Sequence, residues 1–430
     1  MTYLSVILVY LFALIAIGIV KSRKIHTQSD FALAGRALTP WVLVGTMLAS
    51  WIGTGSILGN AGKTYETGLA ALMLPIGSIL GIILLTRIAG KVRSYEKYTV
   101  PEIIGDRYGP VARNLSVFTL VMAYMVIVSY QYNAGGAVLY TILADNTGTS
   151  IISIELATII AAVFIIAYTM LAGLLSVAYT DAANSIIMTL ALIISLPILW
   201  IKAGSWSGME TAFAAMNKSQ HMQFGGVYSA MDIINFCLPP FLLVIGDANM
   251  YQRFSASKDV QSARHSTTIL VFAVLFIELL IIVSAWVSSS MIPEAEVGKH
   301  VLIYAAHQFL PTFLGAIMLT TIVGIIISTA DSFLLVPANT LIRDIYLNYI
   351  NPQASEKNIV RLSRLLVLLL GIIAYIVSIG FSRSAGFFER ALYAYTIYGA
   401  AITPALVAAL FWKGATKEGA VSSIICGILV

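Results

Sequence analysis

Three acidic side chains stand inside apolar runs of the sequence and are the first candidates for chemistry. Asp181 follows SVAYT, Asp247 follows LLVIG, and Asp331 follows IIISTA. If these runs cross a membrane, an unpaired carboxylate at their centre costs about 2.5–3.5 kcal/mol or more, so such acids are functional candidates by default. The alternative for Asp181 is that it only caps the N-terminus of a helix.

Hydroxyl groups lie close to Asp331 in the sequence. Positions 325, 328, 329 and 332 have the spacing i, i+3, i+4, i+7, which predicts that Ser328, Thr329 and Ser332 share one face of a helix. Asp331, three residues after Ser328, is expected to join that side. Hydroxyl, carbonyl and carboxylate oxygens suit a hard cation such as sodium. The alternative is that these hydroxyls only mediate packing between membrane helices.

Two apolar segments carry residues that interrupt a helix. GTMLASWIGTGSILG (45–59) contains four glycines, and NFCLPPFLLVIGDANMYQR (235–253) contains Pro239, Pro240 and Gly246. Backbone at membrane depth loses its helical hydrogen bonds only where it lines a cavity or is buried in protein. Five segments separate the two breaks, which is the expected signature of an inverted five-helix repeat with a site at the membrane midplane. The alternative is that Gly and Pro are simply frequent in membrane helices.

The composition excludes a soluble protein. Hydrophobic residues make up 59% of the chain and charged residues 10%, with a mean hydropathy of +0.90. A soluble domain carries about 25% charged residues. The net charge of +5 does not indicate a nucleic-acid partner, because Lys and Arg lie in short loops between apolar runs.

Neither redox nor enzymatic chemistry is expected. Cys237 and Cys426 both lie inside apolar stretches, so a structural disulfide is not expected. No metal cluster, nucleophile–base pair or phosphate-binding loop rises above background in the sequence, so the chain is not expected to be an enzyme.

Twelve apolar segments are each long enough to cross a membrane, or nearly so. They cover residues 3–20, 39–61, 67–90, 113–143, 151–173, 179–202, 230–252, 266–291, 311–341, 361–381, 388–412 and 417–430. The last stops at Val430 after roughly half a crossing, so the natural chain is expected to continue. Between them, residues 99–108 predict a short capped helix on the cytoplasmic side, and the 203–229 loop predicts a helix at the surface.

The basic residues predict an orientation. When the segments alternate from an outside N-terminus, cytoplasmic loops and helix ends hold 19 of the 25 Lys and Arg residues and the outside holds six. Lys21, Arg23 and Lys24 follow the first apolar run rather than precede it, which argues against a cleaved secretory signal. The expected location is the plasma membrane, as a multi-pass protein of a bacterial inner membrane with its N-terminus outside.

Several motifs occur in order along the chain, namely FALAGRAL (31–38), TVPEIIGDRYG (99–109), LAGLLSVAYTDAANS (171–185), YQRFSASKD (251–259), and STADS followed by RDIY (328–332, 343–346). With these motifs the chain resembles the sodium/solute symporter family from about residue 30 to residue 412. That family includes the sodium/galactose, sodium/proline and sodium/sialic acid symporters and the choline transporters.

The resemblance implies an all-α integral membrane protein with the LeuT-type fold, a 5+5 inverted-repeat helix bundle. Its parts would be an extra N-terminal helix with a linker (1–38), a first five-helix repeat (39–202), an extracellular loop (203–229), a second repeat (230–412) and the start of a further helix (413–430).

By position, the resemblance also implies a sodium site. The backbone carbonyls of Ala49, Ile52 and Ile325 would join the hydroxyls of Ser328 and Thr329. Some members have a second sodium site, which here would use Asp181, Asp331 and Ser332. An Asp at position 331 is not universal in the family, so this residue could instead accept a proton.

The solute site departs from the better-known relatives. Sugar carriers have a polar acid or amide where this chain has Pro75, the proline carrier has an Asp where it has Trp51, and sialic acid carriers have an Arg within 114–143, where this chain has no Lys or Arg. Trp51 and Pro75 are more similar to the choline branch, which surrounds a quaternary ammonium with aromatic rings. Candidate solute residues are Trp51, Gly53, Asp247 and Tyr130.

An indole wall, an acid and no fixed cation favour a cationic or zwitterionic solute over an anion. The alternative for Asp247 is a gate beside Arg253. The expected function is sodium-coupled symport of a small organic solute into the cell by alternating access, with Na+ as the co-transported ion. The competing functions are a solute-sensing module of a signalling protein and a proton-coupled carrier. The expected partners are sodium, the solute and the lipid bilayer, with no nucleic acid and no obligate protein partner.

Overall fold

The structure is a computed structural model, and it describes residues 2–23, 25–144, 150–294, 298, 300–381 and 386–429. Three residues that entered the orientation, Lys24, Lys299 and Arg383, lie outside the described residues, as does Val430 at the end of the last predicted segment. All regular elements in the described part of the chain are helices, and β-pairing there is limited to two isolated bridges.

The first part of the chain runs from the N-terminus to the end of a long kinked helix. Its elements are α1 (Thr2–Ser22), α2 (Gln28–Leu33), η1 (Ala34–Arg36), α3 (Pro40–Trp51), η2 (Gly55–Asn60), α4 (Ala61–Thr67), η3 (Gly68–Met73), α5 (Ile76–Ser94), α6 (Val100–Tyr108), α7 (Pro110–Leu143) and α8 (Ile154–Lys202).

The second part begins with a surface helix, as the sequence predicts. Its elements are α9 (Ser205–Ala215), η4 (Ser219–Met222), α10 (Ala230–Gly246), α11 (Ala248–Ala256), α12 (Val260–Ser289), α14 (Val301–Gln308), α15 (Thr312–Thr340), η5 (Leu341–Ile350), α16 (Glu356–Phe381), α17 (Phe387–Ala401), α18 (Thr403–Phe411) and α19 (Lys417–Leu429).

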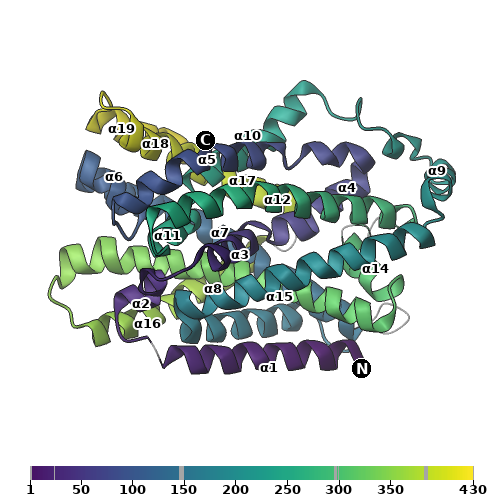
Figure 1. Ribbon diagram of the computed structural model, residues 1–430, viewed down its shortest axis with the longest axis horizontal. Coiled ribbons are helices and arrows are strands. Elements are labelled where there is room, and N and C mark those ends of the chain that lie inside the picture. Colours follow the sequence, from purple (N-terminus) through teal and green to yellow (C-terminus); the bar gives the residue numbers. More distant parts are fainter. Residues whose placement is uncertain are drawn as a thin grey trace.

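The long helices run roughly parallel to the longest axis of the molecule, and the two ends of the bundle differ (Figure 1). The N-terminal end carries α4, α9 and α14, whereas the opposite end, called the α6 end below, carries α6 and α19. Helix α15 is the most buried long helix and α1 lies at the periphery. Eight described helices are long and apolar enough to cross a membrane, or nine if the bent pair of α3 with η2–η3 is one crossing.

Two predicted crossings are joined in α8. The sequence predicts separate segments at 151–173 and 179–202, but the structure has one helical run of 49 residues, interrupted at Gly173 by φ 56° and ψ 173°. A straight helix of that length would extend about 74 Å, and the hydrocarbon core is about 30 Å thick. The kink at Gly173 therefore divides α8 into two crossings.

Both predicted breaks are present. Helix α3 ends at Trp51, Ile52 is non-helical with ψ 83°, and the chain resumes in the π-helical turn η2 at an angle of 50° to α3. Helix α10 ends at Gly246, Asp247 is extended with ψ 112°, and α11 follows. The two breaks interrupt helices in the interior of the bundle, where protein surrounds the non-helical backbone.

Candidate ion and solute site

The first break lies directly against α15. The Thr329 hydroxyl donates to the Ala49 carbonyl at 3.3 Å, and Ile52 and Ile325 are both buried. A Cβ added at Gly53 would lie 2.9 Å from the Thr329 Oγ1 atom. Only glycine therefore allows the backbone at the end of α3 to approach α15 this closely. The structure therefore brings together the elements that carry the first predicted sodium site.

A buried acid–base pair lies beside that site. Asp181 accepts hydrogen bonds from Ser328 at 2.5 Å and from Thr46 at 2.6 Å, and it lies 3.5 Å from the Arg253 guanidinium. Arg253 is fully buried and also donates to Thr46 at 3.0 Å and to Ser332 at 2.6 Å. One positive and one negative group thus offset each other at the junction of α3, α8, α11 and α15.

Asp331 is separate from this group. Its carboxylate accepts a hydrogen bond from Thr169 in the first half of α8, whereas Ser328 and Ser332 face Asp181 and Arg253. The expectation that Asp331 joins the side of Ser328 therefore does not describe its hydrogen bonds. The physical reason for this separation is that both halves of α8 pack against α15. The first half offers Thr169 to Asp331, and the second half offers Asp181 to Ser328.

Asp247 fixes the second break. Its carboxylate accepts from the Asn249 backbone N–H at 3.1 Å, as an N-cap of α11, and from the Tyr124 hydroxyl at 2.5 Å. It is 1% exposed and is absent from the lining of the three cavities described below. Tyr130 is also buried and lies against Tyr395.

Trp51 and Tyr395 form the aromatic wall of a small interior cavity. Their rings are stacked, with centroids 6.4 Å apart and planes at 24°. The cavity has a volume of about 40 Å³ and is bordered by Pro75 and Ser78 of the third predicted segment. Gly55 completes the wall, because a Cβ there would lie 2.9 Å from the Tyr395 hydroxyl oxygen.

Glu278 of α12 is the acid that lines this cavity, and the sequence analysis missed it. The residue is 2% exposed and accepts hydrogen bonds from Ser56 at 2.5 Å and from Asn60 at 3.1 Å. The signal was present in the sequence as a single acid in the apolar run VFAVLFIELLIIV (271–283). The sequence suggests Arg253 only as a neighbour of Asp247. In the structure Arg253 is fully buried and pairs with Asp181.

A larger cavity of about 920 Å³ lies toward the N-terminal end. Its lining includes Lys63, Glu66, Tyr375, Phe388 and Arg390. Phe388 also lines the small cavity, and its backbone packs against Gly59 of η2, where an added Cβ would lie 3.2 Å from the Phe388 Cα atom. Because the large cavity is rich in charged side chains, it suits water and solute rather than lipid.

The α6 end is held by ion pairs. Asp106 pairs with Lys97 and with Arg113, the latter at 3.0 Å. The hydrogen bond with Asp106 raises the pKa of the Lys97 ammonium above its usual value. Buried Asp344 of η5 accepts from Thr99 at 2.6 Å and lies 3.7 Å from Arg113. These contacts join α6 and the start of α7 to η5.

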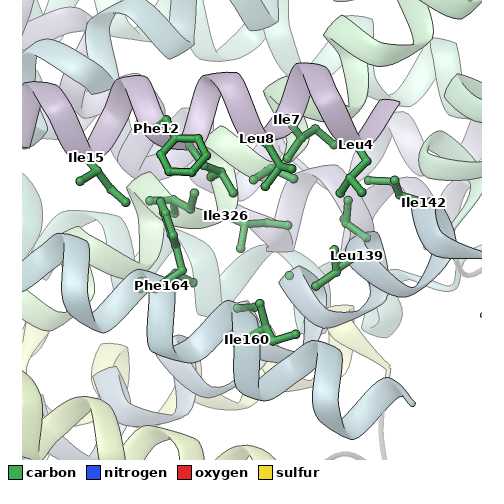
Figure 2. Close-up of a pocket in the computed structure, with 17 residues that line it drawn as sticks. Leu4, Ile7, Leu8, Phe12, Ile15, Leu139, Ile142, Ile160, Phe164 and Ile326 are labelled. Carbon is green, nitrogen blue, oxygen red and sulfur yellow. The ribbon is translucent and has the colours of Figure 1, made fainter. Parts of the chain in front are cut away.

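The third cavity is apolar and faces α1. It has a volume of about 280 Å³, and Figure 2 shows Leu4, Leu8 and Phe12 of α1 pointing toward Leu139, Ile160 and Phe164 of α7 and α8. All of its lining side chains are apolar. It therefore offers no hydrogen-bonding group that would select a polar solute.

Known proteins of similar sequence and structure are carriers of small organic solutes. A sodium/proline symporter of Haemophilus influenzae is 26% identical over 97% of this chain and 85% of its own. An osmoregulated proline transporter of Bacillus subtilis is 25% identical over 97% and 86%. The solved structure of a Na+-coupled sialic acid symporter, in a substrate-bound outward-open state, matches 100% of this chain and 97% of its own with a TM-score of 0.83 and 15% identity.

These likenesses confirm the LeuT-type fold and the main functional prediction. The chain is a multi-pass membrane transporter and not an enzyme, and it couples the movement of a small organic solute to Na+. A family model for the sodium:solute symporter family matches residues 31–427. The chain belongs to the sodium:solute symporter family.

Proposed function

We propose that this protein carries a small cationic or zwitterionic solute into the cell together with sodium, by alternating access, with its N-terminus outside. One observation carries the proposal. The broken helix that presents the Ala49 carbonyl to Thr329 also presents Trp51 and Gly55 to the small cavity. Ion and solute would therefore bind to opposite sides of one short stretch of unwound backbone.

This shared stretch gives a physical basis for coupling. Sodium bound by Ala49, Ile52, Ile325, Ser328 and Thr329 would hold the first break against α15, and the solute would then meet an already ordered wall. The large cavity lies on the N-terminal side of the small one, and ion pairs join the elements of the α6 end. With the N-terminus outside, this arrangement corresponds to an outward-facing state.

The sodium gradient would supply the work. One sodium ion that moves inward through 100 mV releases about 2.3 kcal/mol from the voltage alone. Transport of a neutral, zwitterionic or cationic solute with sodium should therefore carry current.

The solute class follows from the side chains of the small cavity. Trp51, Tyr395 and Phe388 offer aromatic faces, which attract cations. Two relatives transport proline, a zwitterion, which supports this class without identifying the solute. The similarity to the choline branch rests on Trp51 and Pro75 and remains part of the proposal.

A second ion site at Asp181, Asp331 and Ser332 is also part of the proposal. Arg253 already neutralises Asp181 and binds Ser332, so a second sodium would share these groups with a guanidinium. Asp331 is the better candidate for a proton, because its carboxylate has a hydroxyl partner, Thr169, and no Lys or Arg pairs with it among the described residues.

The test is current from full-length protein in sodium-free liposomes when solutes are added with and without external sodium. Choline, betaine, amino acids, polyamines, sugars and carboxylates form the panel. Ser328→Ala and Thr329→Ala should each raise the sodium concentration for half-maximal current by about tenfold to a hundredfold, since a hydrogen-bonding group facing a charge contributes about 1.5–3 kcal/mol.

Thr320→Ala and Ser288→Ala are matched controls, because both hydroxyls are buried and bond only to the carbonyl one helical turn earlier. They should leave the sodium dependence unchanged. Uptake that is independent of sodium and driven by a pH gradient would contradict the sodium assignment and indicate Asp331 as a proton carrier. Sodium-dependent solute binding without any uptake would instead favour the sensor.

A further inference from the structure

The geometry points to Glu278 as the residue that receives the cationic group of the solute, in the small cavity walled by Trp51 and Tyr395. This inference rests on the proposed function, and it assigns the solute an ammonium group, substituted or not. Glu278 is then a specificity-determining residue and not part of the sodium site.

Glu278 is a buried carboxylate without a counter-charge. Its two oxygens accept from Ser56 at 2.5 Å and from the Asn60 amide at 3.1 Å, and both donors are neutral. No Lys or Arg of the described residues forms an ion pair with it. A buried carboxylate in this position is stabilised when a cation binds beside it.

The cavity beside Glu278 has a volume of about 40 Å³, which exceeds the roughly 10–15 Å³ that a single water molecule requires and leaves room for the charged head of a solute. Trp51 and Tyr395 add aromatic faces around the same space, so charge and cation–π attraction would act together. The other two aromatic rings of the lining, Phe236 and Phe388, already lie 5.9 Å from the Lys63 ammonium.

The small cavity adjoins the large cavity of about 920 Å³, because Phe388 borders both. The Phe388 backbone packs against Gly59 of η2, where an added Cβ would lie 3.2 Å from the Phe388 Cα atom, so a solute that reaches Glu278 from the N-terminal end requires η2 and α17 to separate there. Ser56 and Asn60 belong to η2, the part of the broken helix just beyond the sodium residues. Binding at Glu278 would therefore draw on the same element that sodium orders.

The three acids that the sequence singles out are already engaged. Asp181 pairs with Arg253, and Asp247 caps α11 and binds Tyr124. Asp331 bonds to Thr169 on the far side of α15. None of these three lines the small cavity, so the acid predicted for the solute at Asp247 is supplied by Glu278 instead.

The experiment compares solutes that differ only in the positive charge. Full-length protein in liposomes under a sodium gradient is given proline against cyclopentanecarboxylate, and choline against 3,3-dimethylbutan-1-ol. The native protein should transport at least one charged partner and reject its uncharged analogue. Glu278→Gln should raise the KM for that solute by about tenfold to a hundredfold, with the sodium half-saturation unchanged.

Glu278→Asp keeps the charge on a shorter arm and should retain the preference for the charged partner with a smaller rise in KM. Glu210→Gln on exposed α9 is the charge control and should behave as the native protein. Sodium-driven uptake that does not distinguish the paired solutes, or that is unaltered in Glu278→Gln, overturns the inference and leaves the proposed function standing.

A shift in sodium half-saturation without a shift in KM would also overturn it, because Glu278 would then serve the ion. If no solute of either kind moves with sodium, the proposed function fails first. These outcomes separate the two claims.

Discussion

At the scale of single residues, Asp181 and Arg253 form a buried ion pair that is surrounded by hydroxyl groups. Both side chains are at most 1% exposed, and between them they bind Thr46, Ser328 and Ser332. Each charge is tolerated there only because the other neutralises it, since an isolated buried ion carries a large desolvation cost.

Asp181→Asn should therefore leave Arg253 as an uncompensated buried cation and destabilise the protein by about 3–5 kcal/mol. Thermal unfolding of the purified protein, followed by tryptophan fluorescence, measures the loss. The double variant Asp181→Asn/Arg253→Gln removes both charges and should recover part of it. An Asp181→Asn protein as stable as the native one would contradict the role of this pair.

The sequence predicted some site residues and missed others for identifiable reasons. Asp181 was predicted because an acid is unusual within an apolar run, and Trp51 was predicted from the family resemblance. Glu278 carried the same signal but lies in an unbroken helix, away from any motif. The partner of Asp331, Thr169, could not be predicted, because it depends on which helices pack together.

At the scale of elements, the two breaks, the short helix at 99–108 and the surface helix in the 203–229 loop were predicted from Gly, Pro and capping residues. Gly53 was expected to contact solute, but its backbone faces Thr329 of α15, and Gly55 faces Tyr395. Two glycines that are two residues apart therefore lie against different helices. The sequence could not show which helices the two glycines face, because that depends on how α15 and α17 pack around the break.

The two glycines make a matched pair for a test of function. Gly53→Ala forces the first break away from Thr329 and should raise the sodium concentration for half-maximal uptake, while Gly55→Ala pushes Tyr395 and should raise the solute KM. Overpacking costs of about 1–3 kcal/mol correspond to changes of roughly fivefold to a hundredfold. Uptake kinetics measured against sodium and against solute separate the effects. Equal effects of both variants on both constants would contradict the division.

At the scale of the whole molecule, the LeuT-type fold was predicted by ordered motifs and by the spacing of the breaks. The state of the transporter was not, because it depends on a small free-energy difference between packed arrangements. Arg113 pairs with Asp344 and Glu102 pairs with Arg343, so ion pairs join α7 and α6 to η5, and the large cavity lies toward the N-terminal end. We therefore expect these pairs to hold the α6 end closed.

Glu102→Gln removes two ion pairs, of which the one with Arg343 joins α6 to η5. An exposed pair contributes up to about 1 kcal/mol, so the population with an open α6 end should rise by up to roughly fivefold. Spin labels at Arg107→Cys and Gln353→Cys, with Cys237 and Cys426 replaced by Ser, report the distance across this end. Added sodium should restore the native distance distribution, because the ion favours the opposite opening. Glu418→Gln, which removes an acid at the same end that forms no ion pair among the described residues, is the control. Identical distributions in Glu102→Gln and native protein would show that packing, and not charge, closes this end.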